Sequence, residues 1–220
     1  YQIDPSDLST VGAYDFAGEL STSFTAHPKI DPVTGHLHFF GYFFAEPYVT
    51  YHVADASGAL IHSEVIPARG PTMMHSFAIT DRDAIFWELP VLFDGMFEPR
   101  GWPFSWDESF GARIGVMPLG GPASQIRWIE IDPCYVFHEL NAFREGDDVI
   151  VDVCRYDRMM AGERFGAVNP YLTRWRLGTA GAALTFSEQR LDDTLWEFPF
   201  HDRRFTGRPN RYGWLTTVSY

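Results

Sequence analysis

The stretch Pro71-Thr-Met-Met-His-Ser-Phe-Ala-Ile-Thr80 sets a single histidine, His75, where a Gly-Pro turn gives way to an apolar strand. A histidine in such a position is either a hydrogen-bonded core residue or a metal ligand, and the first is far commoner. Two more histidines, His27 and His138, also lie at boundaries between an apolar strand and a polar turn. Three histidines in similar positions therefore favour a metal site more than one does, with purely structural histidines as the alternative.

Short apolar strands separated by glycine, proline or aspartate turns continue on both sides of this stretch. Helical periodicity is almost absent, so the chain is predicted to be all-β. The strands expected are Leu37–Phe44, Pro47–Val53, Ala59–Ile66, 75–80, Ala84–Phe93, Ile126–Ile131, Tyr135–Phe137, Val149–Tyr156, Tyr171–Leu177 and Ala182–Ser187.

The spacing of the histidines favours a β-propeller. His27 and His75 are 48 residues apart, close to the roughly 40–50 residues of a four-stranded blade. His75 and His138 are 63 residues apart, which fits one blade plus an insertion rich in proline, glycine and aromatic residues at about 94–123. Successive blades bring equivalent strand ends to one axis, so the three side chains are expected to converge. A β-sandwich is the alternative fold.

Charge, cysteine content and hydropathy limit the classes of partner and the cellular location that the sequence allows. The formal charge of −12 argues against nucleic acid as a partner. The two cysteines, Cys134 and Cys154, have no metal-ligand spacing and are expected to be free buried thiols in a cytoplasmic protein, with a single disulfide as the alternative. The sequence contains no apolar run long enough for a membrane-spanning helix. The chain starts at Tyr1 and stops at Tyr220 within an apolar run, which is typical of an internal fragment cut at both ends.

An all-histidine site suits a borderline divalent metal such as iron, zinc or copper. Metal-bound histidines usually donate their second ring N–H to a carboxylate or a carbonyl. Glu197, 59 residues after His138 in an aromatic stretch, is the candidate carboxylate, with a surface strand glutamate as the alternative. The remaining histidines lie in tight turns, alternating strands or a charged loop and are expected to be structural: His36, His38, His52, His62 and His201. His36 and His38 in particular are expected to face solvent or a sheet edge.

Several segments of the sequence form a recognisable set in this order: Thr25-Ala-His-Pro-Lys-Ile-Asp-Pro-Val-Thr-Gly35, Gly41-Tyr42, Tyr51-His-Val53, Pro71–Thr80, Glu88-Leu-Pro90, Arg113-Ile-Gly-Val116 with Pro118, Phe137-His-Glu-Leu-Asn-Ala142, Glu197-Phe-Pro199 and Arg211-Tyr-Gly213. With these segments the sequence resembles the carotenoid cleavage oxygenase family, which includes lignostilbene dioxygenases and the vertebrate retinal isomerohydrolase. The resemblance extends over nearly the whole chain.

The resemblance implies part of a seven-bladed β-propeller, about four blades, with residues 1–220 a partial domain truncated at both ends. It also implies non-haem Fe(II) held on the axis by four histidines, three of which match His27, His75 and His138. The fourth would lie beyond Tyr220. One of the family's three supporting glutamates matches Glu197, which by its order along the chain is expected to support His138.

The activity that the resemblance implies is cleavage of a carbon–carbon double bond of a carotenoid, apocarotenoid or stilbene with O2, giving aldehyde or ketone products. Phe137 and Phe198 match positions that line the family's substrate cleft, with plain core packing as the alternative. Two other functions stay open. One is a non-catalytic propeller with structural histidines, and the other is a family scaffold that performs isomerisation or ester hydrolysis.

The insertion Val91–Trp106 is rich in aromatic residues and poor in charge. It is expected to be a lid loop packed on the propeller. The alternatives are the mouth of a substrate tunnel and a patch that touches a membrane at its surface, from which a lipophilic alkene is extracted. The expected partners are therefore an apolar or aromatic alkene and O2, with no protein partner implied.

Overall fold

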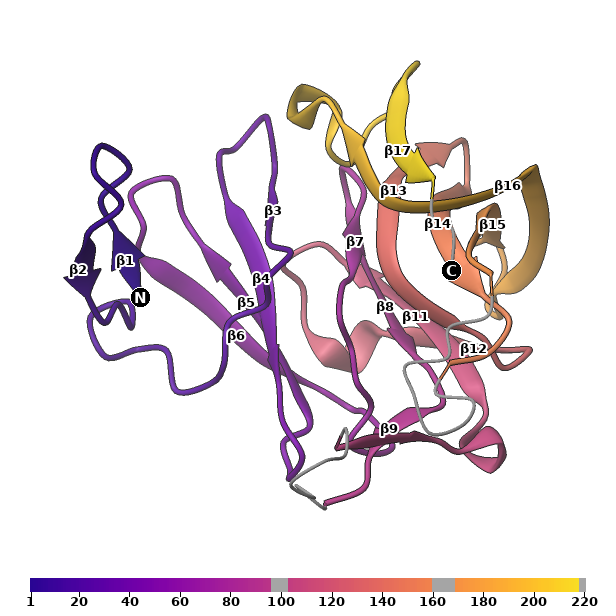
Figure 1. Ribbon diagram of the computed structural model, residues 1–220, viewed down its shortest axis with the longest axis horizontal. Helices are drawn as coiled ribbons and strands as arrows, with labels where there is room; N and C mark the ends of the chain where they lie inside the picture. The colour runs from indigo at the N-terminus through magenta and orange to yellow at the C-terminus, as the bar shows by residue number, and fades with distance from the viewer. Residues whose placement is uncertain (96–102, 160–168, 218–220) are drawn as a thin grey trace.

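The computed structural model describes residues 1–95, 103–159 and 169–217 and shows an almost entirely β protein (Figure 1). Its main sheets are antiparallel, with strands in sequential order. The first contains β3 (Lys29–Ile30), β4 (Leu37–Tyr42), β5 (Val49–Ala54) and β6 (Leu60–Ile66). The second contains β7 (Ala78–Ile79), β8 (Asp83–Glu88), β11 (Ala112–Pro118) and β12 (Arg127–Ile131). The third contains β13 (Tyr135–Glu145), β14 (Asp148–Tyr156), β15 (Tyr171–Gly178), β16 (Thr185–His201) and β17 (Gly213–Thr217).

Sequential four-stranded sheets set side by side are the blades of a β-propeller. In Figure 1 the first sheet lies on the left, the third on the upper right and the second between them. The last strand of the third sheet, β16, runs on beyond its pairing with β15 and pairs with β17 through its C-terminal half. The chain therefore forms three sheets and begins another, in agreement with the predicted partial propeller.

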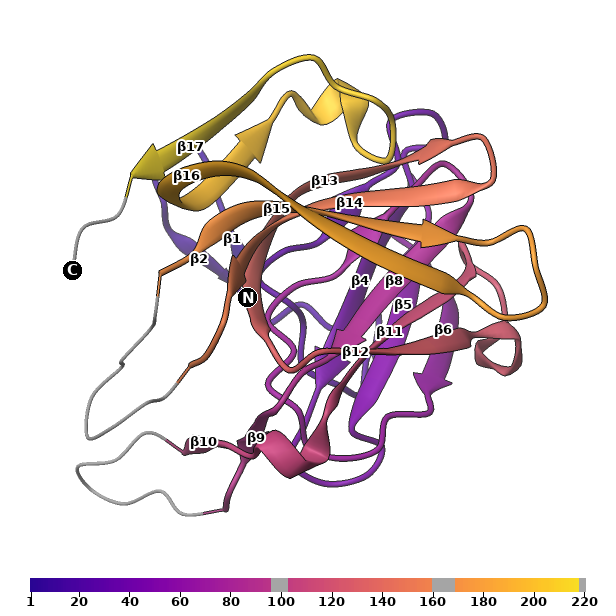
Figure 2. The ribbon, with the colours of Figure 1, turned by 90° about the vertical axis from the view of Figure 1, so that its right-hand side faces the viewer.

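Two small hairpins and three short 3-10 helices complete the described structure. The hairpins are β1 (Gln2–Ile3) with β2 (Thr10–Gly12) and β9 (Val91–Phe93) with β10 (Phe104–Trp106). The helices are η1 (Glu108–Phe110), η2 (Ala123–Gln125) and η3 (Arg203–Phe205). The β9–β10 hairpin and the β16–β17 pair lie at opposite ends of the molecule (Figure 2).

The core lies between neighbouring sheets. All six residues of β5 and of β8 are buried, because each of these strands is covered on both faces. Tyr51 and Phe86 meet edge to face between the first and second sheets, and Trp87 meets Trp175 in the same way between the second and third. Burying an apolar side chain of this size contributes about 1.5–3 kcal/mol. The outer strand β6 alternates exposed and part-buried residues, as a strand with one solvated face should.

The structure corrects several expectations from sequence, among them the predicted strand Tyr135–Phe137, which is the start of the much longer β13. The segment 94–123 is not all insertion, because β11 within it is a strand of the second sheet. Only residues 78–79 of the predicted strand 75–80 pair as a strand, so His75 lies before β7. Strand β16 is far longer than the predicted Ala182–Ser187. Both cysteines are free and buried, as predicted. Within the described ranges, no helix is long and apolar enough to span a membrane.

Candidate metal centre

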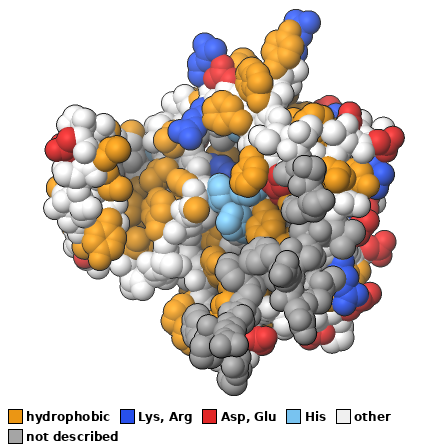
Figure 3. Space-filling model, viewed as in Figure 1, with side chains coloured by type: hydrophobic (Ala, Val, Ile, Leu, Met, Phe, Trp, Pro, Cys, Tyr) orange, Lys and Arg blue, Asp and Glu red, His pale blue; other side chains and the backbone are white. Residues whose placement is uncertain are grey.

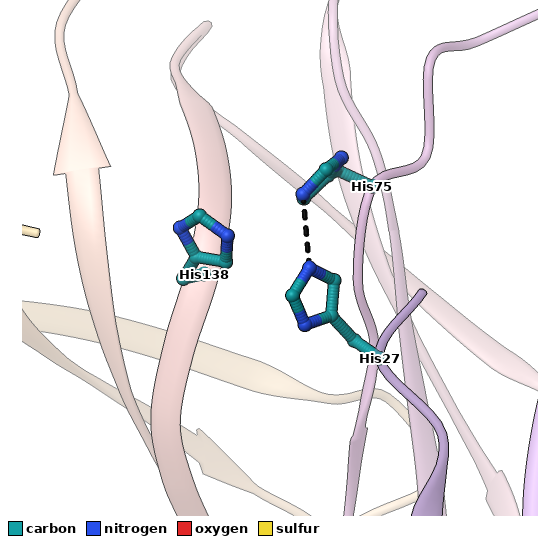
Figure 4. Close-up of side chains that lie close together, drawn as sticks. All are labelled: His27, His75 and His138. Carbon is teal, nitrogen blue, oxygen red and sulfur yellow. Dashed lines mark hydrogen bonds between the residues drawn. The ribbon is translucent and has the colours of Figure 1, made fainter. Parts of the chain in front are cut away.

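Three histidines converge, each in or just before the first strand of one of the three sheets (Figure 4). His27 lies two residues before β3, His75 lies three residues before β7, and His138 lies within β13. One nitrogen of each ring lies within 4.8 Å of those of the other two. In the space-filling view, pale-blue histidine side chains lie at the floor of a hollow in the middle of this face, among hydrophobic side chains (Figure 3).

The rings face one another closely. The Nε2 atoms of His27 and His75 are 3.0 Å apart. The ring centroids are 4.7 Å apart for His27 and His75, 4.9 Å for His27 and His138, and 5.0 Å for His75 and His138. Three imidazoles therefore surround one point, from segments as much as 111 residues apart in the sequence (138 − 27).

Hydrogen bonds hold the two segments that precede strands. The Thr25 amide donates to the Phe40 carbonyl at 2.8 Å, and the Thr25 hydroxyl accepts from the His27 amide at 3.2 Å. The Met73 amide donates to the Val91 carbonyl at 2.8 Å, which ties the segment before His75 to β9. His27 and His75 are thus fixed although neither lies in a strand.

A β-bulge turns His138 toward the other two rings. The pairing of β13 with β14 shifts register on both sides of Glu139, next to His138. Bulges re-aim side chains and are common beside functional sites. A second irregularity interrupts the pairing of β16 with β17 between Glu197 and Phe200, where Phe198 has a φ of 50°. That left-handed conformation is costly for a large aromatic residue and marks a locally strained site.

Glu197 fixes the orientation of His138. Its Oε2 lies 2.6 Å from Nδ1 of His138 and also accepts from the Phe198 amide at 2.7 Å. Its Oε1 accepts from the Tyr156 hydroxyl at 2.7 Å. Because a carboxylate accepts, the proton of His138 belongs on Nδ1, and the lone pair of Nε2 is directed away from Glu197. The carboxylate is buried and has partners on both oxygens.

Burial keeps two of the rings neutral. Burial, reinforced by the neighbouring His138 and His27 rings, lowers the pKa of His75 to about 4. Burial and the nearby His138 also lower the pKa of His27. Neutral imidazole is the form that binds metal ions. His27 and His75 can therefore bind a cation at neutral pH without first losing protons.

The arrangement fits a divalent metal. Two nitrogen ligands at right angles on a metal, with bonds of about 2.1 Å, lie about 3.0 Å apart, which matches the separation of the two Nε2 atoms. The donor set is three imidazoles with one carboxylate behind them, and it suits iron, zinc or copper. Among the described residues, this is the one group of three or more possible ligands that lie so close together.

An apolar cavity of about 440 Å³ opens beside His75. Aromatic side chains dominate its wall: Phe24, Tyr42, Phe43, Phe44, Phe93 and Phe104. Phe93 and Phe104 belong to the β9–β10 hairpin, and Phe93 stacks on Phe44 with ring centroids 5.0 Å apart. The described part of the predicted insertion thus packs on the sheets and also lines this cavity. Met96, Phe97 and Trp102 of that insertion lie outside the described residues.

A second cavity, of about 500 Å³, lies beside His27 and His138 and is more polar. Lys29 and Glu139 form an ion pair there. Lys29 follows His27 by two residues in the sequence, and Glu139 directly follows His138. His201 and Arg203 also line it. The three histidines therefore border an apolar cavity through His75 and a polar cavity through His27 and His138.

The two phenylalanines predicted to bind substrate lie near the histidines in different surroundings. The Phe137 ring meets the His75 ring edge to face at 5.2 Å and packs between Tyr135 and Tyr156. Phe198 lies against the His138 ring at 5.4 Å and lines the polar cavity.

The five other histidines do not join the cluster. The prediction that His38 faces solvent or an edge is wrong. His38 is only 2% exposed, and its Nδ1 lies 2.6 Å from the Tyr51 hydroxyl. Its ring turns inward because it lies on the face of β4 that stacks on Tyr51. His52 is equally buried, between Thr22 and Ser63.

Sequence reasoning missed Tyr156 and the aromatic pair Phe43 and Phe44. No pattern in the sequence identifies Tyr156, because its role depends on a hydrogen bond to Glu197 that forms only in the folded protein. The sequence signal for Phe43 and Phe44 is their position directly after Gly41-Tyr42, at the end of an apolar strand. In the structure both side chains are about half exposed. Two adjacent exposed aromatics at a strand end are typical of a binding surface.

Comparisons with known proteins identify the family of the chain and its fold. The family model described as retinal pigment epithelial membrane protein matches residues 1–220. Carotenoid 9,10(9',10')-cleavage dioxygenase 1 of Phaseolus vulgaris is 36% identical over 98% of the chain and 41% of its own length. The crystal structure of a lignostilbene dioxygenase from Pseudomonas brassicacearum superposes with a TM-score of 0.85 at 29% identity, covering 99% of this chain and 48% of that one.

A cobalt-substituted apocarotenoid oxygenase of Synechocystis superposes with a TM-score of 0.84 at 26% identity, covering 99% of this chain and 50% of that one. The chain thus spans about half the length of the relatives and solved structures that it matches.

Proposed function

The chain belongs to the retinal pigment epithelial membrane protein family of carotenoid cleavage oxygenases, and on that basis we propose that the complete protein is an alkene-cleaving dioxygenase. It uses O2 to cleave a carbon–carbon double bond of a carotenoid, apocarotenoid or stilbene into aldehyde or ketone products. The family fold is a seven-bladed β-propeller, of which the three sheets described above are blades. The observation that supports the proposal best is the convergence of three histidines beside an aromatic cavity.

We propose His27, His75 and His138 as ligands of Fe(II). When bound, Fe(II) supplies the redox chemistry that activates O2 toward an alkene. Glu197 holds the Nδ1 proton of His138 and so directs the Nε2 lone pair toward the site. Because imidazole donors are neutral when they bind a metal ion, the site keeps the full charge of that ion, and the Glu197 carboxylate lies on the far side of the His138 ring.

The aromatic cavity beside His75 is the proposed substrate site. Its wall offers ring faces and edges and a single phenol, Tyr42, so it suits a planar conjugated substrate without charge. The rings exclude water from the histidine side that faces the substrate. Phe137, which meets His75 edge to face, supports this wall from behind. Phe198 stays a candidate contact on the His138 side.

The test uses the complete protein, loaded with Fe(II) under anaerobic conditions and then given ¹⁸O2 with an apocarotenoid or a hydroxystilbene. The expected result is stoichiometric iron and ¹⁸O in the carbonyl products. The complete protein carrying His75→Ala is the matched control and should give neither. Products without ¹⁸O would indicate a non-oxygenative reaction. A protein that binds no iron after reconstitution would contradict the proposal and favour structural histidines.

A further inference from the structure

Two tyrosines lie directly opposite each other at the start of the β13–β14 ladder, beside the histidine cluster. Tyr135 of β13 pairs with Tyr156 of β14. Both are almost completely buried, with exposed fractions of 0% and 2%. Phe137 packs edge to face against both rings and against the ring of His75. Burial raises the pKa of the Tyr135 hydroxyl well above its usual range, so this hydroxyl is a permanent donor.

The Tyr156 hydroxyl supports His138 through Glu197. It donates to Glu197 Oε1 at 2.7 Å, while Oε2 of the same carboxylate bonds Nδ1 of His138 at 2.6 Å. Both oxygens of the carboxylate therefore have a partner. Without the hydroxyl, the buried Oε1 would lose its bond to Tyr156, and the carboxylate could gain by rotating away from His138.

The Tyr135 hydroxyl supports His75 through the backbone. It donates to the Met73 carbonyl at 2.8 Å, two residues before His75. The segment that contains Met73 and His75 precedes β7 and has no sheet ladder of its own at His75. A buried bond from the third sheet thus fixes the distance between this segment and β13, which contains His138.

We propose that Tyr135 and Tyr156 form a positioning pair that sets the relative placement of two metal-binding histidines, one from each of two sheets. Tyr156 orients the imidazole of His138, and Tyr135 fixes the backbone before His75. This inference rests on the proposed function, because the three histidines must hold a metal ion for their placement to matter. Neither tyrosine touches the metal ion or the substrate; each acts through another group.

The test compares phenylalanine variants of the complete protein, which remove only a hydroxyl. Tyr156→Phe is expected to weaken Co(II) binding about tenfold, as the loss of an outer-shell partner typically does. The same change should shift the visible absorption of bound Co(II), because His138 no longer keeps one orientation. Tyr135→Phe should also weaken binding. Dissociation constants are measured by competition with a chromophoric chelator.

Tyr51→Phe is the matched control. Tyr51 is as buried as the pair, and its hydroxyl also makes a buried bond, to His38 at 2.6 Å, away from the cluster. Its loss should lower the melting temperature about as much as the loss of either paired hydroxyl and leave the Co(II) affinity and spectrum unchanged. Equal Co(II) affinities and spectra in all three variants and the wild type would overturn the inference.

A metal-free measurement separates this inference from the proposed function. In the apo-protein labelled with ¹⁵N-histidine, the proton between His138 Nδ1 and Glu197 should give a downfield ¹H signal that Tyr156→Phe shifts or broadens. Tyr51→Phe should leave it in place. If the wild type binds no metal, the proposed function fails, while this signal still tests the link from Tyr156 to His138. An unchanged signal in Tyr156→Phe would refute the positioning role.

Discussion

At the scale of single residues, the same imidazole group has different roles in this chain because its neighbours differ. His38 bonds the Tyr51 hydroxyl, and His52 lies between the hydroxyls of Thr22 and Ser63. His27 and His75 face each other across two sheets, with their Nε2 atoms 3.0 Å apart. A hydroxyl partner occupies a nitrogen of a buried imidazole, whereas two imidazoles that face each other can direct their nitrogen lone pairs to one metal ion.

Removing one imidazole should separate these roles. In the complete protein, His75→Ala is expected to lose stoichiometric iron, since it removes a donor from the centre of the cluster. His62→Ala, on the outer strand β6, should keep it. Iron is measured after anaerobic reconstitution and desalting. Equal iron in the two variants would refute the assignment of His75.

The free energy of unfolding should depend on pH through His38 and His52. Burial lowers the pKa of each to about 4, from an ordinary value of 6.5. Between these values the unfolded chain binds protons that the folded protein does not, so the stability should fall as the pH falls from 6.5 toward 4. Urea midpoints at about pH 7 and about pH 5 measure this fall. His38→Gln and His52→Gln should each reduce the difference; an unchanged difference in both would contradict it.

At the scale of single elements, irregular strands place the site. Regular β-strands direct alternate side chains to opposite faces, yet His138 and Glu197 each lie beside a break in register. The bulges in β13 and β16 turn both side chains toward the same place. The positive φ of Phe198 is part of the same distortion. The hydrogen bond between His138 and Glu197 therefore depends on two local departures from ideal strand geometry.

A close contact of one glycine in β4 also controls the segment before His27. A Cβ atom on Gly41 would lie 2.3 Å from the Ser23 carbonyl oxygen and 2.6 Å from the Thr22 hydroxyl. Gly41→Ala should therefore push that segment outward, destabilise the protein by about 1–3 kcal/mol and weaken iron binding. Gly181→Ala is the control, because its Cβ would make only an ordinary contact at 3.4 Å. Urea unfolding and iron titration measure both effects, and equal stability of the two variants would contradict the prediction.

Much of this element structure was predictable from sequence, and the misses have physical causes. Alternation and turn residues identified β4, β5, β6, β14 and β15 with small errors at their ends. Strand β11 was missed because it lies beyond a stretch rich in glycine, proline and aromatics. Strand β16 looked short because charged residues occupy its exposed middle, Ser187–Asp193. The convergence of the histidines followed from blade spacing, whereas the tyrosine pair depends on contacts between sheets that no local pattern encodes.

At the scale of the whole molecule, buried polar contacts join the sheets. Arg144 of β13 forms a two-bond ion pair with Asp83 of β8, at 2.7 and 2.5 Å, and Thr80 donates to the same carboxylate. The Asp83 carboxylate raises the pKa of Arg144, chiefly by hydrogen bonding. Lys29 of β3 pairs with Glu139 of β13. The first contact joins the second and third sheets, and the second joins the first strands of the first and third sheets.

Breaking the Arg144 contact should therefore cost far more than breaking a surface ion pair. Arg144→Met leaves Asp83 buried without its cation and should destabilise the protein by about 3 kcal/mol. Arg176→Met removes an exposed pair with Glu145 and Asp148 and should cost about 0.5 kcal/mol. Urea unfolding of the two variants of the complete protein gives both values. A smaller loss for Arg144→Met than for Arg176→Met would contradict this account of how the sheets are joined.

Strand β16 also imposes an order on biosynthesis. The ribosome delivers the chain from its N-terminus, so His27, His75 and His138 have all been made before the carboxylate of Glu197. The second half of β16, which contains Glu197, is completed as a paired strand only when β17 has followed it. During translation, the third imidazole is thus made 59 residues before the carboxylate that fixes its proton (197 − 138 = 59). The orientation of His138 is therefore completed only after these residues and β17 have been added.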